Sequence, residues 1–135
     1  MNLADRAYIA GIIDGEGTIT LVRKHINENY SPEVSVANTN LNLLNWLKKK
    51  TDGGVILKKQ KRSERHSDAY TWKLRGNKAL DLLSKVQELL IIKKQHAELL
   101  LRNYKEYTPR NGRYTSEQLQ NKMKLVAEIR KLNSR

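Results

Sequence analysis

The sequence predicts an α+β domain in which two β-hairpins are each followed by a helix, in the order αββαββα, with further helices after them. Four segments alternate between apolar and polar residues, as half-buried strands do, and the segments around them have helical apolar spacing. A length of 135 residues suits one domain. We expect one antiparallel four-stranded sheet with helices on one face, in a single domain over 1–135 with its core in 1–95 and additional C-terminal helices in 96–135.

The N-terminal part begins with a helix from about Leu3 to Asp14, after which Gly15 and Gly17 allow a sharp reversal of the chain. The strands of the first hairpin are expected at 18–26 and 33–39. A second helix begins near Asn40, a favourable N-cap residue, and is stopped by two glycines, Gly53 and Gly54.

The second hairpin is expected to have strands at 55–61 and 69–75, joined by a polar tip over 60–68. Asn77 is expected to cap a third helix, and a fourth covers roughly 92–107. The capping-box pattern from Thr115 to Gln118 opens the last helix. Its apolar stripe is expected to consist of Leu119, Met123, Val126 and Ile129.

The balance of charges is strongly basic, with 26 Lys and Arg against 14 Asp and Glu and a formal net charge of +12. Such a surplus opposes compaction through self-repulsion, and nucleic acid is its leading partner. An anionic membrane surface is the alternative, but no run of about 18 apolar residues exists. No signal-like or transit-like N-terminus is visible. We therefore expect a protein that is not secreted, from a bacterial or phage-infected cytoplasm or an organellar matrix or stroma.

The chain contains no cysteine, which excludes disulfides and thiolate zinc sites. Its three histidines, His25, His66 and His96, do not have the spacing of metal ligands. A packing role is expected for His96, because it lies on an amphipathic helical segment.

The most informative segment is IAGIIDGEG, residues 9–17. Ala7, Gly11 and Gly15 recur at a spacing of four and share one helix face, which lets a second helix approach closely. Glu16 stands between two glycines, an unusual place for an acid that serves only solubility. If two such helices pack side by side, two copies of Glu16 meet, and this pair of carboxylates suits a divalent metal. The simpler interpretation is a helix C-terminus followed by a glycine turn.

This segment resembles the motif of the LAGLIDADG homing endonucleases, with conservative changes only. The resemblance implies a site-specific, metal-dependent endonuclease that hydrolyses phosphodiester bonds of double-stranded DNA at a long, near-palindromic target, as in intron homing. Because the chain has one motif, the resemblance implies a homodimer with two-fold symmetry that grips roughly twenty base pairs. The expected dimer-interface residues are Ala7, Ala10, Gly11 and Asp14.

The resemblance also implies the chemistry of the site. Glu16 from each subunit would be the principal metal ligand, and the backbone carbonyl of Gly15 is a plausible further ligand. Hard oxygen ligands favour Mg²⁺. Mn²⁺ is a substitute, and Ca²⁺ is expected to support binding without efficient turnover.

Two further catalytic residues are implied, a polar side chain near the end of the second strand and a lysine near the start of a late helix. The best matches are Asn38 and Lys93, with Asn40 and Lys94 as the alternatives. Asn38 would organise metal-bound water, although a turn or capping role is an equal interpretation. Lys93 would lie near the scissile phosphate, or else be a solvated lysine at a helix N-terminus. Asp14 is expected to form hydrogen bonds at the helix end rather than bind metal.

The polar face of the sheet is expected to bind DNA. A strand rises about 3.3 Å per residue and a base pair about 3.4 Å, so strands of about eight residues follow about eight base pairs. The major groove admits a two-stranded ribbon. The expected DNA-binding residues are Thr18, Thr20, Lys24, Lys59, Lys61, Arg62, Arg65, Thr71, Lys73 and Arg75. The alternative is a face that is polar only because it is wet.

Two other classes of function remain open. A non-cleaving nucleic-acid binder on the same scaffold, either an intron RNA-splicing maturase or a transcription regulator, would keep the basic sheet but could lose the acid. Glu16 favours the nuclease, because packing alone would accept a neutral residue there. A basic ribosome-associated protein would explain the charge but not the motif.

Overall fold

The computed structural model describes residues 1–59 and 68–134 of the chain. Along them the elements are α1 (Leu3–Glu16), β1 (Gly17–Val22), β2 (Ser31–Asn38), α2 (Leu41–Thr51), β3 (Val55–Lys59), β4 (Ala69–Arg75), α3 (Asn77–Val86), α4 (Lys94–Asn103) and α5 (Ser116–Asn133). This is the expected order αββαββα followed by further helices, so the predicted α+β fold class is confirmed. Lys61, Arg62, Arg65 and His66 lie outside the described residues.

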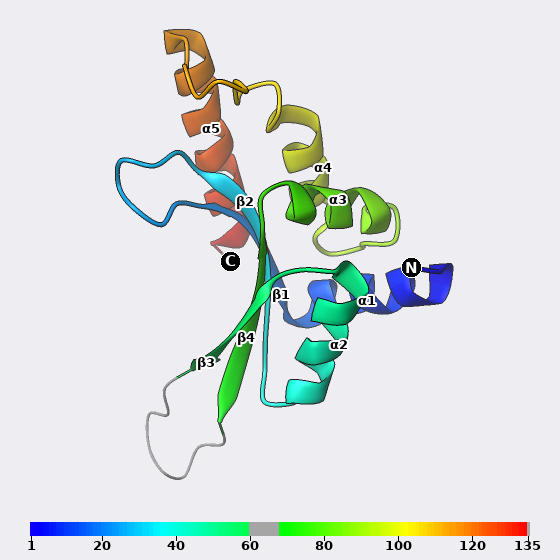
Figure 1. Cartoon of the computed structure of the whole chain (residues 1–135). Coiled ribbons are helices and arrows are strands. Elements are labelled where there is room, and N and C mark those ends of the chain that lie inside the picture. The colour runs from blue at the N-terminus through cyan, green and yellow to red at the C-terminus, as the bar shows by residue number, and fades with distance from the viewer. Residues whose placement is uncertain (60–67, 135) are drawn as a thin grey trace.

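The four strands form one antiparallel sheet in the order β1-β2-β4-β3, so β1 and β3 are its edges. The two hairpins meet through β2 and β4, which pair from Glu33 opposite Arg75 to Asn38 opposite Tyr70. Figure 1 shows α1, α2 and α3 on the same side of this sheet. The opposite, outer face is left open over most of the strands, as the sequence predicted for a sheet with one apolar and one polar face.

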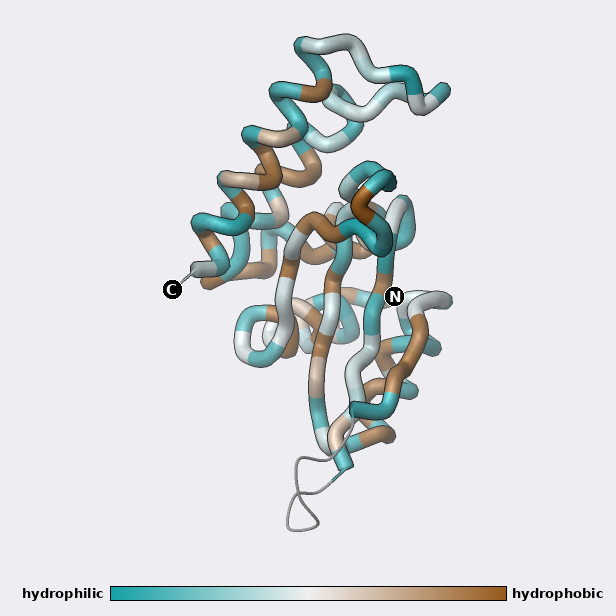
Figure 2. The backbone as a smooth tube through the Cα atoms, turned by 90° about the vertical axis from the view of Figure 1, so that its left-hand side faces the viewer, coloured by the Kyte–Doolittle hydropathy of each residue, from teal (hydrophilic) through white to brown (hydrophobic). Residues whose placement is uncertain are grey.

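The inner face of the sheet follows the predicted alternation. Ile19 and Leu21 of β1 are 0% and 4% exposed, and Val34 of β2 and Trp72 of β4 are fully buried beside them. Figure 2 shows the alternation as brown and teal segments along the strands. The indole Nε1 of Trp72 donates a hydrogen bond to the carbonyl of Gly53 at 3.1 Å, so the largest buried side chain also satisfies its polar atom.

α1 ends two residues later than expected. The helix continues through Glu16, and Gly17 already begins β1 with φ −92° and ψ 169°. The expected turn at Gly15 and Gly17 is therefore wrong. Gly17 is required by space rather than by conformation, because a Cβ there would lie 2.8 Å from the Cα of Ile13 and 2.9 Å from its carbonyl oxygen. The chain passes from helix to strand without a loop, and the last helical turn carries Glu16.

The predicted helix caps are confirmed in two cases and wrong in one. Asn40 caps α2 by accepting hydrogen bonds from the backbone of Asn42 and Leu43, and Thr115 and Gln118 form the capping box of α5. Asn77, by contrast, is the first residue of α3. The N-cap position belongs to Gly76, whose φ of 71° favours glycine and whose missing side chain makes no capping bond.

Several strand and helix limits also differ from the expectation. β1 ends at Val22, so Lys24 lies in the exposed hairpin loop instead of on the strand face. In α5, Leu119 and Met123 of the predicted apolar stripe are 47% and 44% exposed, whereas Lys122 is buried. The α5 stripe is therefore correct only in its second half, where Val126 and Ile129 pack into the core. α4 is shorter than expected at both ends.

The two C-terminal helices extend the core. α5 runs along the edge strand β1, and the side-chain amide of Asn133 donates a hydrogen bond to the carbonyl of Ile19 at 3.0 Å. This bond occupies part of an otherwise open strand edge. Nearer the start of α5, the ammonium of Lys122 lies 4.7 Å and 5.0 Å from the ring centroids of Tyr104 and Tyr114. None of the helices in the described residues is both long and apolar enough to span a bilayer.

Candidate active site

The carboxylate of Glu16 is exposed at the C-terminal end of α1 and is held by one neighbour. The amide nitrogen Nδ2 of Asn38, the last residue of β2, donates to Oε2 of Glu16 at 2.8 Å. The amide oxygen of Asn38 accepts a hydrogen bond from the backbone of Asn40 at 2.7 Å, which fixes the turn into α2. Asn38 thus combines the turn role with contact to Glu16, and Asn40, its alternative, serves as the helix cap instead.

The second oxygen of Glu16, Oε1, makes no hydrogen bond within the part of the chain that the structure describes. It is a hard, exposed oxygen donor at a helix end. Gly15, whose carbonyl was expected as a further ligand, is also exposed, and a Cβ built on it meets nothing within 4 Å. No group of three or more His, Asp or Glu suited to a metal occurs among the described residues.

Asp14 and Lys93 join the end of α1 to the start of α4. The two carboxylate oxygens of Asp14 accept hydrogen bonds from the backbone N–H groups of Ile91, at 2.7 Å, and Lys93, at 3.0 Å. In return, Nζ of Lys93 donates to the backbone carbonyl of Asp14 at 2.8 Å. The last turn of α1 has no basic residue of its own, so Lys93 supplies the positive charge that its free carbonyls attract.

This exchange confirms that Asp14 forms hydrogen bonds at the helix end, but its partners lie 77 and 79 residues away instead of within its own helix. Lys93 is half-buried and immediately precedes α4. Lys94, its alternative, is exposed and lies in the first turn of α4. Of the two lysines, Lys93 is the one that contacts the helix carrying Glu16.

Lys93 is one of the residues that line a cavity of about 420 Å³ between β1, α4 and the end of α5. Thr18, His96 and Asn133 also line it. His96 is 7% exposed, as its expected packing role requires. Burial lowers the pKa of His96 below its ordinary value of 6.5, hydrogen bonding to Asn133 acts in the opposite direction, and the charge of Lys93 lowers it further. The imidazole is therefore neutral at pH 7.

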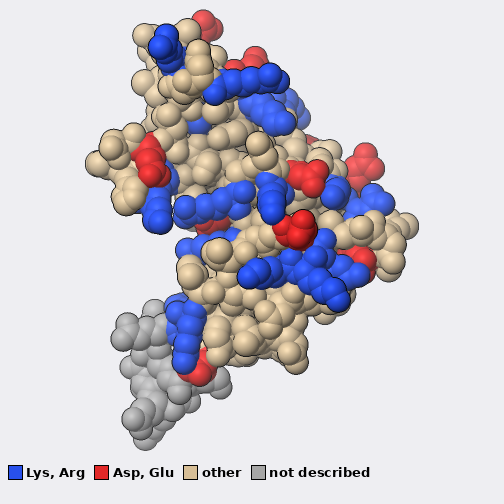
Figure 3. All heavy atoms as spheres, in the orientation of Figure 1, with Lys and Arg blue, Asp and Glu red and all other residues tan. Residues whose placement is uncertain are grey.

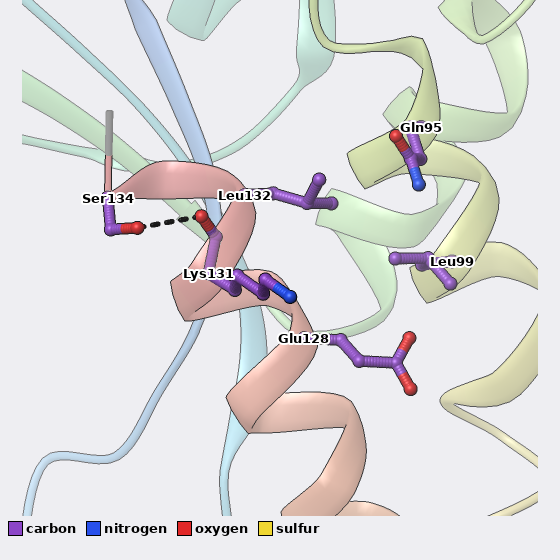
Figure 4. A pocket seen from close by; sticks show the side chains of 6 residues that line it. All are labelled: Gln95, Leu99, Glu128, Lys131, Leu132 and Ser134. Atoms are coloured by element: carbon purple, nitrogen blue, oxygen red, sulfur yellow. Dashed lines mark hydrogen bonds between the residues drawn. The ribbon is translucent and has the colours of Figure 1, made fainter.

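A neighbouring cavity of about 430 Å³ lies between α4 and α5. Figure 4 shows Leu132 of α5 pointing toward α4, with Gln95 and Leu99 on the facing side and Glu128 further along α5. Its lining is mixed and includes none of the expected site residues. The cavity lies beside the contact between the two C-terminal helices, and neither Glu16 nor Asn38 lines it.

The outer face of the sheet carries most of the expected DNA-binding side chains. Thr18 of β1, Ser35 of β2 and Lys73 of β4 form one row across the strands. Thr71 and Lys59 lie on the same face further along. All five are at least partly exposed, so the outward orientation predicted for Thr18, Lys59, Thr71 and Lys73 is confirmed, and Ser35 joins them. Their contact with DNA stays a prediction.

Two features of this face were not expected. Val55 and Leu57 of β3 are 54% and 50% exposed, which adds an apolar margin to a polar face. In the row of Thr20, the register places Glu33 of β2 directly opposite Arg75 of β4. Nε of Arg75 donates to Oε2 of Glu33 at 2.6 Å. The alternation of residues along β2 is enough to place Glu33 on the outer face, but no local pattern in the sequence reveals that Arg75 is its partner.

The exposed face of α1 is bare where the sequence predicted close helix packing. Ala7, Gly11 and Gly15 are exposed, and a Cβ built on Gly11 or Gly15 meets nothing within 4 Å. Ala10, however, is 1% exposed in the core of its own chain, so its predicted place in a dimer interface is wrong. The carboxylate of Asp14 is likewise used within the chain, by the backbone of the segment before α4.

Figure 3 shows patches of basic side chains distributed over the visible face, with fewer acidic ones between them. Ion pairs neutralise some of this charge, for instance Lys50 with Asp5 at 3.2 Å and Lys85 with Asp81 at 3.0 Å. Because the net charge is +12, most of the excess has no acidic partner. The molecule therefore presents a positive field to any large polyanion.

Neither a family model nor a curated protein sequence matches the chain, but solved structures do. The homing endonuclease I-CvuI, in complex with the I-CreI target in the presence of Mg, superimposes with a TM-score of 0.70 over 96% of this chain and 82% of its own, at 19% identity. The archaeal intron-encoded homing endonuclease I-Vdi141I, complexed with DNA, gives 0.67 over 96% and 84%, at 20% identity.

A third match is the LAGLIDADG homing endonuclease I-GzeII in complex with its DNA target, with a TM-score of 0.63 and 17% identity. It covers 90% of this chain but only 43% of its own chain, which is more than twice as long as the matched part. The chain therefore has the fold of the LAGLIDADG homing endonucleases, and the resemblance that residues 9–17 indicated is confirmed.

Proposed function

We propose that the protein is a site-specific, metal-dependent DNA endonuclease that acts as a homodimer. One observation carries this proposal above the others. An exposed carboxylate, that of Glu16, is fixed by Asn38 at the end of a helix whose outer face is bare at Gly11 and Gly15. A second copy of this helix packed on that face brings two such carboxylates together.

The surroundings of α1 support association of two copies. Ile91 and Ile92, in the segment that Asp14 holds against the end of α1, are 85% and 69% exposed. On α1 itself, Leu3 and Tyr8 are 65% and 57% exposed. Large apolar side chains gathered around a bare helix face are typical of a surface that is covered by a partner. The partial match to I-GzeII supports the same view, since that longer chain has room for a second unit.

Divalent metal fits this site. Each chain offers one hard oxygen, Oε1 of Glu16, without a hydrogen bond among the described residues, so a pair of chains with DNA phosphate and water supplies the all-oxygen shell that Mg²⁺ prefers. When bound there, the metal supplies a Lewis acid and an activated water for phosphodiester hydrolysis. Glu16 holds it, with the carbonyl of Gly15 as a further candidate, and Asn38 keeps the Glu16 carboxylate in one orientation.

Lys93 contributes charge beside this site. Its ammonium is anchored 2.8 Å from the carbonyl of Asp14, two residues before Glu16, and it keeps two N–H groups for other partners. Directed at DNA, these groups stabilise negative charge on a phosphate. Asp14 holds both the backbone N–H and the ammonium of Lys93. The ammonium contacts the backbone carbonyl of Asp14 and not its carboxylate, so the positive charge of Lys93 is not paired at Nζ.

The outer face of the sheet supplies the DNA contacts in this proposal. β2 has eight residues, and at about 3.3 Å per residue it follows about eight base pairs of major groove. Two sheets related by a dyad therefore cover roughly sixteen to twenty base pairs. The basic and hydroxyl side chains of this face include Thr18, Thr20, Thr71, Lys73 and Lys59.

The proposal is tested with a pool of randomised DNA duplexes. The full chain is incubated with the pool in Mg²⁺, and cut ends are sequenced; a parallel incubation in Ca²⁺ recovers bound duplexes. We expect the wild type to cut one family of near-palindromic sequences and Glu16→Gln to bind the same family without cutting. Binding without cutting by the wild type in Mg²⁺ would favour the non-cleaving class, and the absence of any preferred duplex would refute the proposal.

A further inference from the structure

Glu33 is an acid on the face that we assign to DNA. Glu33 faces the side of the sheet opposite to its neighbour Val34, and it is paired with Thr20 of β1 and Arg75 of β4. Unlike the other polar residues of this face, it is only 5% exposed. A carboxylate so covered cannot reach a base in a groove, and an exposed one would repel phosphates. Its place therefore needs another explanation than direct contact with DNA.

That explanation is the hydrogen bond between Oε2 of Glu33 and Nε of Arg75, 2.6 Å long. The Arg75 side chain is 42% exposed although its Nε is engaged. Its two Nη groups make no hydrogen bond within the described part of the chain. The guanidinium is planar, so a bond at Nε sets the plane and leaves the Nη groups as a fork directed away from Glu33.

We propose that Arg75 reads a guanine in the major groove and that Glu33 is a positioning residue that orients its guanidinium for this contact. The inference rests on the proposed function, because it assumes that this face lies in a DNA groove. A fork of two Nη groups matches the O6 and N7 acceptors of guanine, which is the commonest specific contact of arginine with DNA.

The paired charges favour a base over a phosphate as the partner of Arg75. Glu33 neutralises much of the guanidinium charge, which weakens long-range attraction to the backbone. Glu33 leaves the orientation of the Nη N–H groups of Arg75 unchanged, and a hydrogen-bonded contact to a base edge depends on this orientation. Lys73, one alternate position earlier on β4, has no carboxylate bound to it among the described residues. It is the better phosphate ligand of the two.

The test compares base preferences of variants on the same pool of randomised duplexes in Ca²⁺, with the full chain. For the wild type we expect a guanine preferred roughly 5- to 150-fold over other bases at one position of each half-site. Arg75→Ala should abolish that preference. Glu33→Ala should reduce it at the same position, and Glu33→Gln, whose amide oxygen can still accept from Nε, should restore part of it. Glu106→Ala, which removes an exposed acid from the segment after α4, should leave the profile unchanged.

The outcomes separate this inference from the proposed function. A selected sequence whose guanine is lost in Arg75→Ala but fully kept in Glu33→Ala would overturn the role of Glu33. A profile unchanged in Arg75→Ala would overturn the guanine contact while leaving the endonuclease intact. If the wild type selects no sequence at all, both the function and the inference are wrong.

A change in the DNA keeps the inference testable even if Glu33→Ala does not fold. Replacing the preferred guanine with 7-deazaguanine removes the N7 acceptor without touching the protein. We expect this to weaken wild-type binding about tenfold and Arg75→Ala binding not at all. Equal losses for both proteins would show that Arg75 does not contact N7.

Discussion

Asp14 and Glu16 are two carboxylates on the last turn of the same helix, and the structure predicts opposite consequences when each is replaced by its amide. Asp14 accepts two backbone hydrogen bonds, at 2.7 Å and 3.0 Å. Glu16 accepts one, from the side chain of Asn38. Asp14→Asn should therefore act mainly on stability, and Glu16→Gln mainly on cleavage.

The magnitude for Asp14 follows from the number of acceptors. An amide offers one oxygen where the carboxylate offers two, and its NH₂ group would face a backbone N–H. A hydrogen bond to a charged group contributes about 1.5–3 kcal/mol, and half-burial of Asp14 favours the lower end. We expect Asp14→Asn to lower the free energy of unfolding by about 2 kcal/mol, or the Tm by roughly 8 °C for a domain of this size.

Glu16→Gln should change the free energy of unfolding by no more than about 0.5 kcal/mol, because the side chain is exposed and an amide oxygen still accepts from Asn38. Cleavage should fall by several orders of magnitude, because the amide removes the charge that holds the metal. Asp14→Asn should reduce cleavage less than Glu16→Gln does, because it only weakens the hydrogen bond that holds the backbone of Lys93.

Thermal unfolding by circular dichroism measures the first effect, and a plasmid-cleavage time course beside a gel-shift titration measures the second. The wild type in Ca²⁺ is the control for binding without turnover. The reasoning is refuted if Asp14→Asn melts with the wild type, since its two hydrogen bonds would then contribute nothing. It is equally refuted for the site if Glu16→Gln cuts at a near-normal rate.

Four further results are expected. Gly11→Leu should fold, since a Cβ there meets nothing within 4 Å, but sediment as a monomer without cleavage; a wild type that is monomeric even on target DNA would contradict the dimer. DNA affinity should fall with salt at a log–log slope of about −5 to −9 for roughly 6–10 phosphate contacts, and Lys73→Ala should reduce the slope by about 1; a flat salt dependence would exclude the electrostatic contact. Burial lowers the pKa of His96 in the folded chain, so as the pH falls the unfolded chain takes up a proton at this position before the folded chain does. The free energy of unfolding should therefore decline as the pH falls below 6.5. Urea unfolding at several pH values should show a weaker decline in His96→Gln. The exposed Leu57 should contact a thymine methyl group, so deoxyuridine at one target position should weaken binding of the wild type but not of Leu57→Ala.

The sequence by itself determined the type and order of the elements, because those depend on local patterns. Alternation at Ile19 and Leu21 was enough to assign the inner face of β1. The side chain of Asn40 and the capping box at Thr115 located two helix starts, since each satisfies backbone groups only a few residues away. The motif over residues 9–17 was specific enough to indicate the fold.

The candidate site was indicated by the motif and by the family resemblance, but its internal contacts were not. The motif singled out Glu16, and the resemblance implied Asn38 and Lys93. The structure brings Asn38 to Glu16 and Lys93 to the same helix end. The end of α1 was misjudged because Gly17 is needed for its close approach to the backbone of Ile13, which is a property of the folded chain. A glycine in sequence does not say which of its uses applies.

Only the tertiary structure decided which distant residues meet. The pairing of β2 with β4 joins Glu33 to Arg75, 42 residues apart. The segment before α4 lies against the end of α1 and joins Asp14 to Lys93, 79 residues apart. The buried side of α5 was likewise decided by β1 and α4, which left Leu119 exposed against expectation. Such contacts follow from strand register and helix packing, and neither leaves a periodic signal in the sequence.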